Sequence, residues 1–452
     1  MIKVITYGTF DLLHTGHLNI LKRAKELGDY LVVGVTSESY DQSRGKLNVS
    51  QTLSQRMENV RKTGLADEII VEERFGQKIE DIQRHKIDRF VIGSDWTNKF
   101  DYLKDYCEVI YLPRTQGISS TELRNEKGII NIGMVGYGRI AGRFIKEARF
   151  VSGIDIRSVF GLSEKRLTEF VKKYERTDFY TNWDNFINAV DAVYIASPHF
   201  THYDYAKRAI MAGKHVLCEK PLTLKKEQAE ELFALAKKKK VILYEAIKTA
   251  YAPCFAQLVG VAKSGLIGQI KNITATFTKQ IADKTLREYN KEYGGGAFNE
   301  LASYPLLAII KMLGYDYKKL NFITTIDKET DVDIYTQAHF IYPTATATAT
   351  TGIGVKQEGE MIIAGTRGYI YVPAPWWKTE FFEVRFEDSS YNIKHFTKFD
   401  GDGLRYEIAD FVTSIHQGQK SYKYRDDESI AISAIIEAYD NSRQSKTNID
   451  FI

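Results

Sequence analysis

The stretch "EKGIINIGMVGYGRIAG", residues 126–142, decides how this chain divides into modules. An apolar run at residues 129–135 leads into Gly136-x-Gly138-x-x-Ala141. The two glycines permit a tight turn and the close approach of a pyrophosphate, while the alanine lets a helix pack on the strand. Such a turn is typical of the start of a dinucleotide-binding domain, yet 128 residues precede its strand. We therefore expect a separate module in residues 1–127.

The composition is that of a soluble globular protein of two or three domains. The chain has 452 residues, of which 44% are apolar and 27% charged, and its formal net charge is +4. This near balance predicts no nucleic-acid partner and no membrane partner. Three widely spaced cysteines, no apolar run of about 20 residues and an N-terminus without a signal pattern predict a cytoplasmic protein without disulfides.

Apolar runs alternate with helical patterns up to about residue 245, which predicts parallel α/β units. The expected strands of this part are residues 3–7, 30–35, 68–71, 89–92, 109–112, 129–135, 158–161, 192–196, 215–218 and 241–244. Beyond residue 265 the pattern predicts a sheet-rich α+β region. Its expected elements are strands at 271–279, 334–341, 345–351 and 368–372, and a helix near 428–442.

Two repetitive segments have structural explanations. The strict alternation in "PTATATATTG", residues 343–352, predicts a strand with one face of small side chains packed on something flat. Four lysines at residues 237–240 follow the helical run "EQAEELFALA" and precede a strand. Because cations complement the dipole at a helix C-terminus, these lysines indicate a helix end rather than a nucleic-acid patch.

The most informative segment of the first module is "YGTFDLLHTGHLNIL", residues 7–21. A strand ends at a glycine, and His14 and His17 flank Gly16 where a helix begins. Two histidines three apart at a helix start could be metal ligands or capping residues. Gly16, however, lets a bulky group approach the backbone, and the helix start offers free N–H donors to a phosphate.

A second segment, "RTQGISST" at residues 114–121, supplies a cation, a glycine turn and three hydroxyls before another helix. Two anion sites at strand-to-helix turns predict a nucleoside triphosphate held between them. Together with "LGDYLVVGV", "IDRFVIGSDW" and "KFDYLKDYCEVIYLPRT", these motifs resemble the glycerol-3-phosphate cytidylyltransferase group of the HxGH nucleotidyltransferases. The resemblance covers nearly all of residues 1–127.

This resemblance implies an in-line displacement, in which a small polyol phosphate attacks the α-phosphorus of CTP and pyrophosphate leaves. Such chemistry depends on positioning and charge neutralisation. His14 and His17 would donate hydrogen bonds to phosphate oxygens, Arg114 would neutralise the triphosphate, and Lys46 is the candidate for a mobile catalytic lysine. Asp11 would bind the Mg²⁺ that accompanies CTP, or only fix the turn. The implied CTP-binding residues are Gly8, Thr9, Phe10, Asp11, Gly16, Ser119, Ser120 and Thr121.

The sequence departs from this group at "SRGKLNVSQTLSQRMENVRKTG", residues 43–64. We expect the contacts that select the acceptor in this segment, and the identity of the polyol phosphate stays open.

The second module carries its most specific pattern in "DAVYIASPHFTHYDYAKRAIMAGKHVLCEKPLTL", residues 191–224. A strand ends at Ser197-Pro198, and "GKHVLCEKPL" places Lys220 at the end of the next strand, where α/β sheets hold their ligands. With "YEAIKTAYAPCF", "GGGAFNELASYPL" and "ESIAISAIIEAYDNS", this pattern resembles the Gfo/Idh/MocA oxidoreductase family. The resemblance covers residues 129–452.

This second resemblance implies hydride transfer between a nicotinamide and a hydroxyl or carbonyl carbon. Lys220 would polarise the substrate oxygen and orient the nicotinamide, and Tyr304 would donate or accept the proton. Glu300 stands where the family usually has an aspartate, and Ala250 where it often has an arginine. The spacing of four predicts Glu300 and Tyr304 on one helix face. The implied cofactor-binding residues are Gly136, Gly138, Arg139, Ile140, Ser197, Pro198, His202, Glu219 and Lys220.

The choice between NAD and NADP stays open at "SVFGLSEKR", residues 158–166. Neither an aspartate for the ribose hydroxyls nor a Ser-Arg pair follows the expected strand. Lys165 or Arg166 could contact a 2′-phosphate, but both could equally be solvated.

The predicted fold class is α/β. A HUP-like Rossmannoid cytidylyltransferase domain (1–127) precedes an NAD(P)-binding Rossmann domain (128–248) and a sheet-rich α+β domain for substrate binding and oligomerisation (249–452). In the family the open face of that last sheet usually mediates assembly. We therefore expect a homo-oligomer, a dimer or a tetramer, that uses the Thr/Ala strand.

The fusion of two enzymes predicts consecutive steps. In the first hypothesis NAD(P)H reduces a ketose or ketose phosphate, and the resulting polyol phosphate reacts with CTP to form a CDP-polyol for teichoic acid or capsule synthesis. In the second, glycerol-3-phosphate is the acceptor and the oxidoreductase acts on an unrelated sugar or on the nucleotide product. In the third, the second module is a non-catalytic scaffold or sensor.

Overall fold

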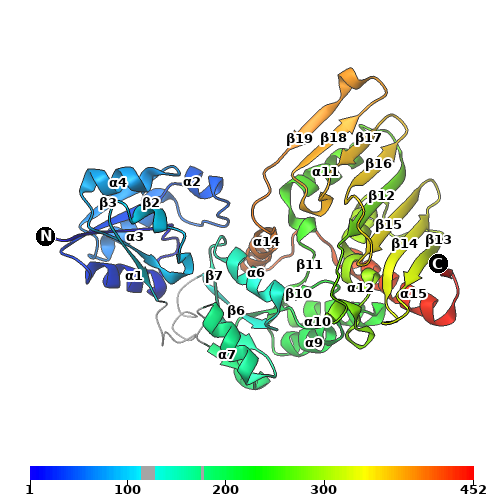
Figure 1. Cartoon of the computed structure of the whole chain (residues 1–452), viewed down its shortest axis with the longest axis horizontal. Helices are drawn as coiled ribbons and strands as arrows, with labels where there is room; N and C mark the ends of the chain where they lie inside the picture. Colours follow the sequence, from blue (N-terminus) through cyan, green and yellow to red (C-terminus); the bar gives the residue numbers. More distant parts are fainter. Residues whose placement is uncertain (114–127, 175–177, 452) are drawn as a thin grey trace. The chain divides into compact units, whose positions relative to one another are not determined.

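The structure, a computed structural model, describes residues 1–113, 128–174 and 178–451 (Figure 1). It contains two compact units, Met1–Ala192 and Val193–Ile452. The predicted α/β fold class is confirmed, with parallel Rossmann-like sheets followed by a sheet-rich region. The boundaries at residues 127/128 and 248/249 stay predictions.

The first sheet has five parallel strands in the order β3-β2-β1-β4-β5. These strands are β1 (Lys3–Gly8), β2 (Tyr30–Thr36), β3 (Glu68–Glu72), β4 (Arg89–Gly93) and β5 (Glu108–Leu112). The connecting helices are α1 (Thr15–Lys25), α2 (Glu38–Ser43), α3 (Leu53–Lys62), α4 (Gln77–His85), η1 (Ser94–Trp96) and η2 (Asp101–Leu103). All five strands were expected from the sequence, because each is a short apolar run between turn residues.

Alternating side chains of this sheet form two cores, one on each face. On one face Val4, Leu31 and Val33 pack with Leu21 of α1 and Val60 of α3. On the opposite face the strand residues Ile5, Val32 and Phe90 pack with Ile82 of α4 and Leu103 of η2. Helices therefore cover both faces, and the carboxyl ends of the strands are left to form a site.

The second sheet has six strands in the order β11-β10-β9-β6-β7-β8. They are β6 (Ile130–Val135), β7 (Ile154–Phe160), β8 (Asp178–Tyr180), β9 (Ala192–Ile195), β10 (His215–Glu219) and β11 (Leu243–Ala246). The helices of this region are α6 (Arg139–Ala148), α7 (Glu164–Lys173), α8 (Trp183–Asn188), η3 (His199–Thr201), α9 (His202–Met211) and α10 (Lys226–Lys239). The four lysines end α10, as expected.

Two strand predictions in this region were displaced. Strand β7 begins at Ile154, four residues before the predicted start. The prediction missed these residues because Asp155 and Arg157 interrupt the apolar pattern, although this part of the strand pairs with β6. Strand β11 begins at Leu243 rather than residue 241, since α10 ends late at a left-handed Lys240.

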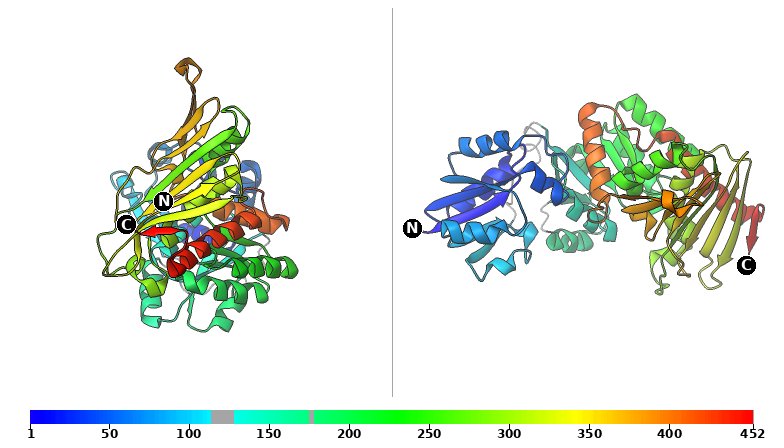
Figure 2. Two further views of the ribbon diagram at one scale, coloured as in Figure 1. Left: turned by 90° about the vertical axis from the view of Figure 1, so that its right-hand side faces the viewer. Right: turned by 90° about the horizontal axis from the view of Figure 1, so that it is seen from above.

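The third sheet has nine strands in the order β19-β18-β17-β16-β12-β15-β14-β13-β20. They are β12 (Ile270–Thr278), β13 (Lys319–Ile326), β14 (Asp333–Ile341), β15 (Thr346–Gly352), β16 (Met361–Gly365), β17 (Tyr369–Val372), β18 (Phe381–Arg385), β19 (Ile393–Phe396) and β20 (Ile449–Phe451). Figure 2 shows the strands of this sheet, coloured green to orange with the C-terminal β20 in red, running side by side as the sheet twists.

The remaining helices are η4 (Lys248–Tyr251), α11 (Pro253–Lys263), η5 (Arg287–Tyr289), η6 (Lys291–Tyr293), α12 (Ala297–Leu301), α13 (Ser303–Leu313), η7 (Trp376–Lys378), η8 (Ser389–Tyr391), α14 (Leu404–Gln417) and α15 (Asp426–Ser445). The helix predicted near residues 428–442 is the longer α15. Among the described helices, none combines the length and the apolar character that crossing a membrane requires.

The Thr/Ala repeat forms β15, in the middle of the nine-stranded sheet. It pairs in parallel with β12 and antiparallel with β14. Ala347 and Ala349 are buried, and α12 and α13 pack against the strand. The alanine methyls let these helices approach closely, as the prediction of a small-residue face requires. Thr346 lies on the opposite face and is exposed.

Candidate active sites

The loop after β1 is tightly turned around Phe10. Phe10 and Leu12 adopt left-handed backbone angles, with φ of 51° and 46°. A Cβ on Gly8 would lie 3.0 Å from the Phe10 ring, so a larger residue at the strand end would have to displace that ring. The buried Phe10 ring then meets the edge of the His17 ring at a centroid distance of 5.4 Å. The ring contact thus joins this loop to the first turn of α1.

The two histidines of the HxGH motif lie one over the other at this helix start. Their ring centroids are 3.8 Å apart, and His14 Nδ1 accepts the Gly16 N–H at 3.1 Å. Because Nδ1 is the acceptor, the ring proton of neutral His14 is on Nε2, which is therefore the donor nitrogen of this ring. A Cβ at residue 16 would come within 2.8 Å of His14 Cε1. Gly16 thus holds the ring in place.

His17 is an uncharged donor in this arrangement. Burial, followed by the charges of His14 and Lys46, lowers the pKa of His17 well below its ordinary value. Its buried Nδ1 has no hydrogen-bond partner among the described residues. Lys46 lies near enough for its charge to affect His17, and its Nζ donates to the Arg149 carbonyl oxygen at 2.8 Å. The catalytic roles of His14, His17 and Lys46 stay predictions.

Asp11 fixes the loop. Its two carboxylate oxygens accept the backbone N–H groups of Ser50 and Gln51, each at 2.9 Å. Among the described residues no group of three or more His, Cys, Asp or Glu side chains is arranged to hold a metal. Asp11 therefore fits the structural alternative better than the Mg²⁺ ligand.

Two arginines near this loop were missed by the sequence interpretation. Arg56 is fully buried, and its Nη1 donates to the carbonyl oxygens of Thr9 and Thr36, each at 2.8 Å. Arg44 Nη2 donates to Thr9 Oγ1 at 2.8 Å, and its Nε donates to Asp41 at 3.0 Å. These contacts pin the β1 loop to the end of β2. The signal for Arg56 was its place on the apolar stripe of α3.

The second triphosphate segment lies outside the described residues. It carries four predicted residues: Arg114, Ser119, Ser120 and Thr121. Their roles stay predictions.

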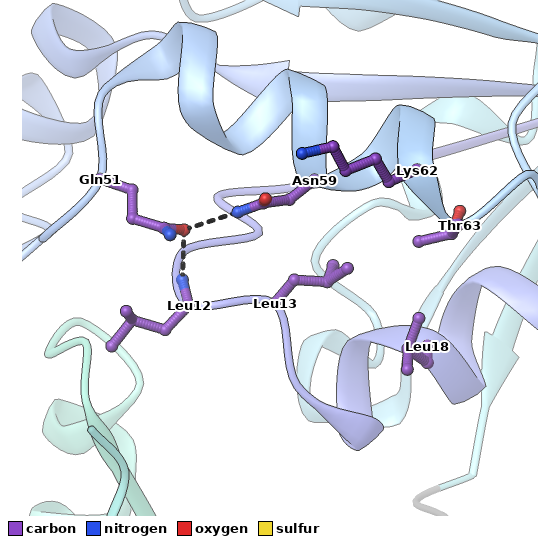
Figure 3. Close-up of a pocket in the computed structure, with 7 residues that line it drawn as sticks. All are labelled: Leu12, Leu13, Leu18, Gln51, Asn59, Lys62 and Thr63. Carbon is purple, nitrogen blue, oxygen red and sulfur yellow. Dashed lines mark hydrogen bonds between the residues drawn. The ribbon is translucent and has the colours of Figure 1, made fainter. Parts of the chain in front are cut away.

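A pocket of about 550 Å³ lies beside the β1 loop. Its lining residues are Leu12, Leu13, Leu18, Gln51, Asn59, Lys62 and Thr63. Figure 3 shows the Gln51 side-chain oxygen between two donors, the Leu12 N–H at 2.9 Å and Asn59 Nδ2 at 3.1 Å. The pocket is thus lined by three leucines and four polar side chains, and the Gln51 side-chain oxygen already accepts two hydrogen bonds.

The glycine turn after β6 has the geometry expected for a pyrophosphate. Gly136 has φ of 103°, and Gly138 precedes the first turn of α6, which includes Arg139 and Ile140. Nothing lies within 4 Å of a Cβ built on Gly138, so a ligand has room to approach the helix N-terminus. Ala141 is buried against the strand. These residues fit the dinucleotide that the sequence implied.

The turn after β9 is closed by its own side chains. Ser197 Oγ and Thr201 Oγ1 lie 2.6 Å apart, and Pro198 starts η3. His202 Nε2 lies 2.9 Å from the Ser197 carbonyl oxygen, and Nδ1 lies 2.8 Å from the Pro221 carbonyl oxygen. His202 therefore ties this turn to the segment after β10. Burial lowers the pKa of His202 to about 4.

Lys220 follows β10 and reaches across to α12. Its Nζ donates to the Glu300 backbone carbonyl at 2.9 Å. The preceding Glu219 is buried, accepts the Tyr194 hydroxyl at 2.6 Å and accepts the Lys220 N–H at 3.3 Å. Burial raises the pKa of Glu219, and the Lys220 charge opposes that shift. Lys220 is thus held at both ends at the carboxyl edge of the sheet.

The Glu300 carboxylate forms an ion pair with Arg287 rather than with Lys220. Arg287 on η5 contacts its two oxygens at 2.8 and 3.0 Å, and His199 Nε2 lies 3.8 Å from Oε1. Burial, followed by the Lys220 charge, lowers the pKa of His199 well below its ordinary value, so this ring is neutral at pH 7. Arg287 therefore supplies the charge that compensates Glu300, and the sequence interpretation had missed both Arg287 and His199.

Tyr304 lies in the first turn of α13, whereas Glu300 lies in α12. The two short helices meet at Ala302, whose dihedral angles are helical. The Tyr304 ring meets the Phe277 ring at a centroid distance of 5.1 Å. The predicted pair thus spans two helices, and the aromatic contact sets the direction of the Tyr304 side chain.

Three family models match the chain. Residues 5–126 match "Cytidylyltransferase-like", residues 130–247 match "Oxidoreductase family, NAD-binding Rossmann fold", and residues 255–371 match the GFO/IDH/MocA C-terminal domain. These three segments follow the order of the predicted modules.

The relatives of known name also match either the N-terminal module or the oxidoreductase part, but not both. Glycerol-3-phosphate cytidylyltransferase of Bacillus spizizenii is 52% identical over 126 residues, 28% of this chain and 97% of that protein. The dTDP-3,4-didehydro-2,6-dideoxy-α-D-glucose 3-reductase of Actinomadura kijaniata is 36% identical over 143 residues, 32% of this chain and 43% of that protein. The structure of the 3-ketoreductase KijD10 from the same organism, in complex with NADP and TDP-benzene, shares the fold. Its TM-score is 0.64 at 22% identity, covering 72% of this chain and 99% of that one.

Proposed function

Because this chain belongs to the cytidylyltransferase-like family at its N-terminus and to the Gfo/Idh/MocA oxidoreductase family from residue 130 onward, we propose that it makes a CDP-polyol in two steps. A ketose phosphate is first reduced with NAD(P)H to a polyol phosphate; a free ketose would give a polyol, which an enzyme outside this chain must phosphorylate before the second step. The resulting polyol phosphate then takes a cytidylyl group from CTP, and the product serves teichoic acid or capsule synthesis. The observation that carries the proposal is that one chain holds both the stacked His14–His17 pair and the anchored Lys220.

The first site supplies donors for a displacement at phosphorus. The acceptor phosphate oxygen forms the new bond to the α-phosphorus of CTP while the bond to the pyrophosphate oxygen breaks. His14 Nε2 and the neutral His17 ring donate hydrogen bonds as charge develops on the phosphate oxygens. Lys46 and Arg44 supply positive charge, and Arg56 and Asp11 hold the loop in position. The Mg²⁺ in this site comes with CTP rather than from a preformed protein site.

The second site binds a carbonyl oxygen and supplies a proton. The nicotinamide cofactor, when bound, supplies the hydride. Lys220 polarises the substrate oxygen, and Tyr304 transfers the proton to it. The Gly136–Gly138 turn with Arg139 and Ile140 would hold the cofactor pyrophosphate. The segments around Ser197, Pro198, His202 and Glu219 position the remaining groups.

The open face of the nine-stranded sheet supports a homo-oligomer, a dimer or a tetramer. A cross-strand row of neighbours on this face joins Ile341, Thr346, Asn272, Ala364 and Tyr369. Ile341 is 45% exposed and Tyr369 is 37% exposed. A second copy packed on this row would cover these side chains, and light scattering of purified protein would detect the assembly.

A second candidate function is favoured by the 52% identity to a glycerol-3-phosphate cytidylyltransferase. Here glycerol-3-phosphate is the acceptor, and the oxidoreductase acts on an unrelated sugar. A non-catalytic scaffold is the least favoured, because the Lys220 ammonium is anchored at the site the family uses.

The experiment supplies the purified chain with CTP, NADPH or NADH, and a panel of three- to five-carbon ketose phosphates and polyol phosphates. We expect one ketose phosphate to oxidise the cofactor, and its polyol phosphate to release pyrophosphate from CTP. Pyrophosphate release with glycerol-3-phosphate alone would favour the second candidate. No oxidation of cofactor with any of the ketose substrates would exclude the two-step proposal.

A further inference from the structure

The connection between α6 and β7 is bonded to the N-terminal module through its backbone. The Leu47 N–H donates to the Phe150 carbonyl oxygen at 2.6 Å, and the Ser152 N–H donates to the Leu47 carbonyl oxygen at 2.9 Å. Leu47 and Val151 thus form a parallel bridge like one step of a β-ladder. Both sides of this contact lie within the first compact unit, Met1–Ala192. The contact therefore joins the transferase part to residues that the oxidoreductase family model covers.

The residue before this bridge is Lys46, the candidate catalytic lysine. Its Nζ donates to the carbonyl oxygen of Arg149, which is the C-cap of α6. The last carbonyl groups of a helix lack partners within the helix and lie at the negative end of its dipole, so they attract an ammonium group. An ammonium has three N–H donors. The bond to Arg149 therefore fixes the side chain and is compatible with a second bond to a phosphate oxygen.

The side chains of the same connection are anchored to η1. The Arg149 guanidinium donates to the backbone carbonyl of Asp95, and Nη2 lies 3.4 Å from the Asp95 carboxylate. The Phe150 ring lies nearly perpendicular to the Trp96 ring, at a centroid distance of 6.3 Å. The connection thus contacts two segments of the N-terminal module, residues 46–47 and residues 95–96.

These two segments lie on either side of the HxGH loop. In the first sheet β2 and β4 flank β1. Residues 46–47 follow β2 and α2, residues 95–96 follow β4 directly, and the HxGH loop follows β1. The connection is therefore held at the carboxyl edge of the sheet, where α/β proteins bind their ligands. Lys46 is close enough there that its charge, after burial and the charge of His14, contributes to lowering the pKa of His17.

The segment 46–51 also reaches the HxGH loop at its other end. The Gln51 N–H donates to Asp11 at 2.9 Å, and Gln51 Oε1 accepts the Leu12 N–H (Figure 3). A Cβ on Gly128 would lie 3.4 Å from Leu12 Cδ1, so the second module begins beside the same loop. The segment is thus fixed at one end by the HxGH loop and at the other by the connection between α6 and β7.

We propose that this connection, residues 149–153, is a positioning element of the transferase site and holds the Lys46 ammonium near the HxGH histidines before CTP binds. The inference rests on the proposed cytidylyl transfer, and it makes the transferase site of this chain dependent on the second module. A cation already in place stabilises charge on phosphate oxygens better than a side chain that must first be ordered. Arg149 acts through Lys46 and needs no contact with CTP. The competing interpretation is that Lys46 only caps α6.

A double-mutant cycle on the full chain, followed by pyrophosphate release, separates these interpretations. Arg149→Met removes the contacts with Asp95 but keeps the carbonyl that Lys46 binds. Lys46→Met removes the cation, and a third variant combines the two changes. Lys146→Met is the matched control, because Lys146 is exposed on the same helix. Cofactor oxidation by each preparation reports on the folding of the second module.

We expect Arg149→Met to lower kcat/KM for CTP about 10-fold and Lys46→Met to lower it about 10²-fold. In the Lys46→Met background, Arg149→Met should change kcat/KM by less than about 2-fold, because no ammonium is left to position. Arg149→Lys should recover part of the loss, since a cation still faces Asp95. Lys146→Met should leave kcat/KM unchanged.

Hydrogen exchange tests the docking without relying on activity. Peptides that cover residues 45–50 should be protected in the unaltered chain and exchange about 10-fold faster in Arg149→Met, but not in Lys146→Met. If exchange in Arg149→Met is unchanged, Arg149→Met combined with Phe150→Ala also removes the contact with Trp96 and takes its place in the cycle.

Two results would overturn the positioning role. The loss from the Arg149 change could be the same with and without Lys46, or faster exchange at residues 45–50 could leave kcat/KM for CTP unaltered. Unprotected peptides in the unaltered chain would exclude the docking itself. If the unaltered chain released no pyrophosphate with any polyol phosphate, the proposed function would fall and the positioning role with it, whereas protection at residues 45–50 would still show the contact.

Discussion

The two candidate sites of this chain are built over very different sequence distances. His14 and His17 stand three residues apart, and the start of α1 alone stacks their rings. Lys220, in contrast, is held by the carbonyl of Glu300, 80 residues later, while Arg287 and His199 meet the carboxylate of that glutamate. A local motif therefore predicts its own geometry, whereas a site assembled from distant segments needs the tertiary structure.

The largest expected effect tests whether the two sites are independent. Lys220→Met should lower the rate of cofactor oxidation about 10³-fold, because it removes the cation that polarises the substrate oxygen. Pyrophosphate release should not change, since the residues proposed for cytidylyl transfer, His14, His17 and Lys46, all belong to the N-terminal module. The control is Lys226→Met, an exposed lysine soon after the same strand. A parallel loss of both activities would contradict the independence of the sites.

The second substitution, His17→Ala, changes the HxGH motif of the first site. His17→Ala removes a neutral donor to the phosphate oxygens and should lower pyrophosphate release about 10²- to 10³-fold. Cofactor oxidation by the same preparation serves as the internal control for folding. An unchanged transferase rate would show that His17 only packs against Phe10.

A third substitution asks how strictly the local geometry is required. A Cβ at residue 16 would lie 2.8 Å from His14 Cε1, so Gly16→Ala must displace the His14 ring. A displacement of about 1 Å in a reacting group costs about 10²-fold, and we expect that loss in pyrophosphate release. The matched control is Gly260→Ala in α11, where nothing lies within 4 Å of the added methyl group. Equal rates for both variants would contradict the steric argument.

The smallest expected effect concerns the long-range site and its dependence on pH. His202 has an ordinary pKa of 6.5, which burial lowers to about 4 in the folded chain. Between these values the unfolded chain binds a proton that the folded chain does not, so stability falls as the pH falls. From pH 7 to pH 5 we expect a loss of about 2 kcal/mol in the free energy of unfolding.

Urea unfolding of the full chain at the two pH values measures this loss. His202→Gln lacks the titrating ring, so its pH dependence should be smaller by about 2 kcal/mol, although the variant also loses a contact with Ser197 or Pro221. The same pH dependence in both proteins would show that other groups control acid stability.

Much of the fold could be predicted because its signals are local. Each strand of the first sheet is an apolar run bounded by turn residues, and the Thr/Ala alternation predicts strand β15. The start of β7 shows the limit of such local prediction. Asp155 interrupts the apolar run in the sequence, but the strand continues through it because its backbone pairs with β6. Arg56 shows the same limit in the site. Its place on an apolar helix face was visible, but the carbonyls of Thr9 and Thr36 that it binds were not.

The sequence by itself determined the two families and the α/β class, and it named candidate catalytic residues in each motif, because glycine turns, helix starts and strand periodicity act over a few residues. Only the tertiary structure decided which groups those residues meet. Lys220 binds the backbone carbonyl of Glu300 rather than its carboxylate, and Glu72 at the end of β3 meets Lys78 of α4. The stretch at residues 126–142 marks where the match to the second family begins. The contacts that the candidate residues of each module make are set instead by burial and charge in the folded chain.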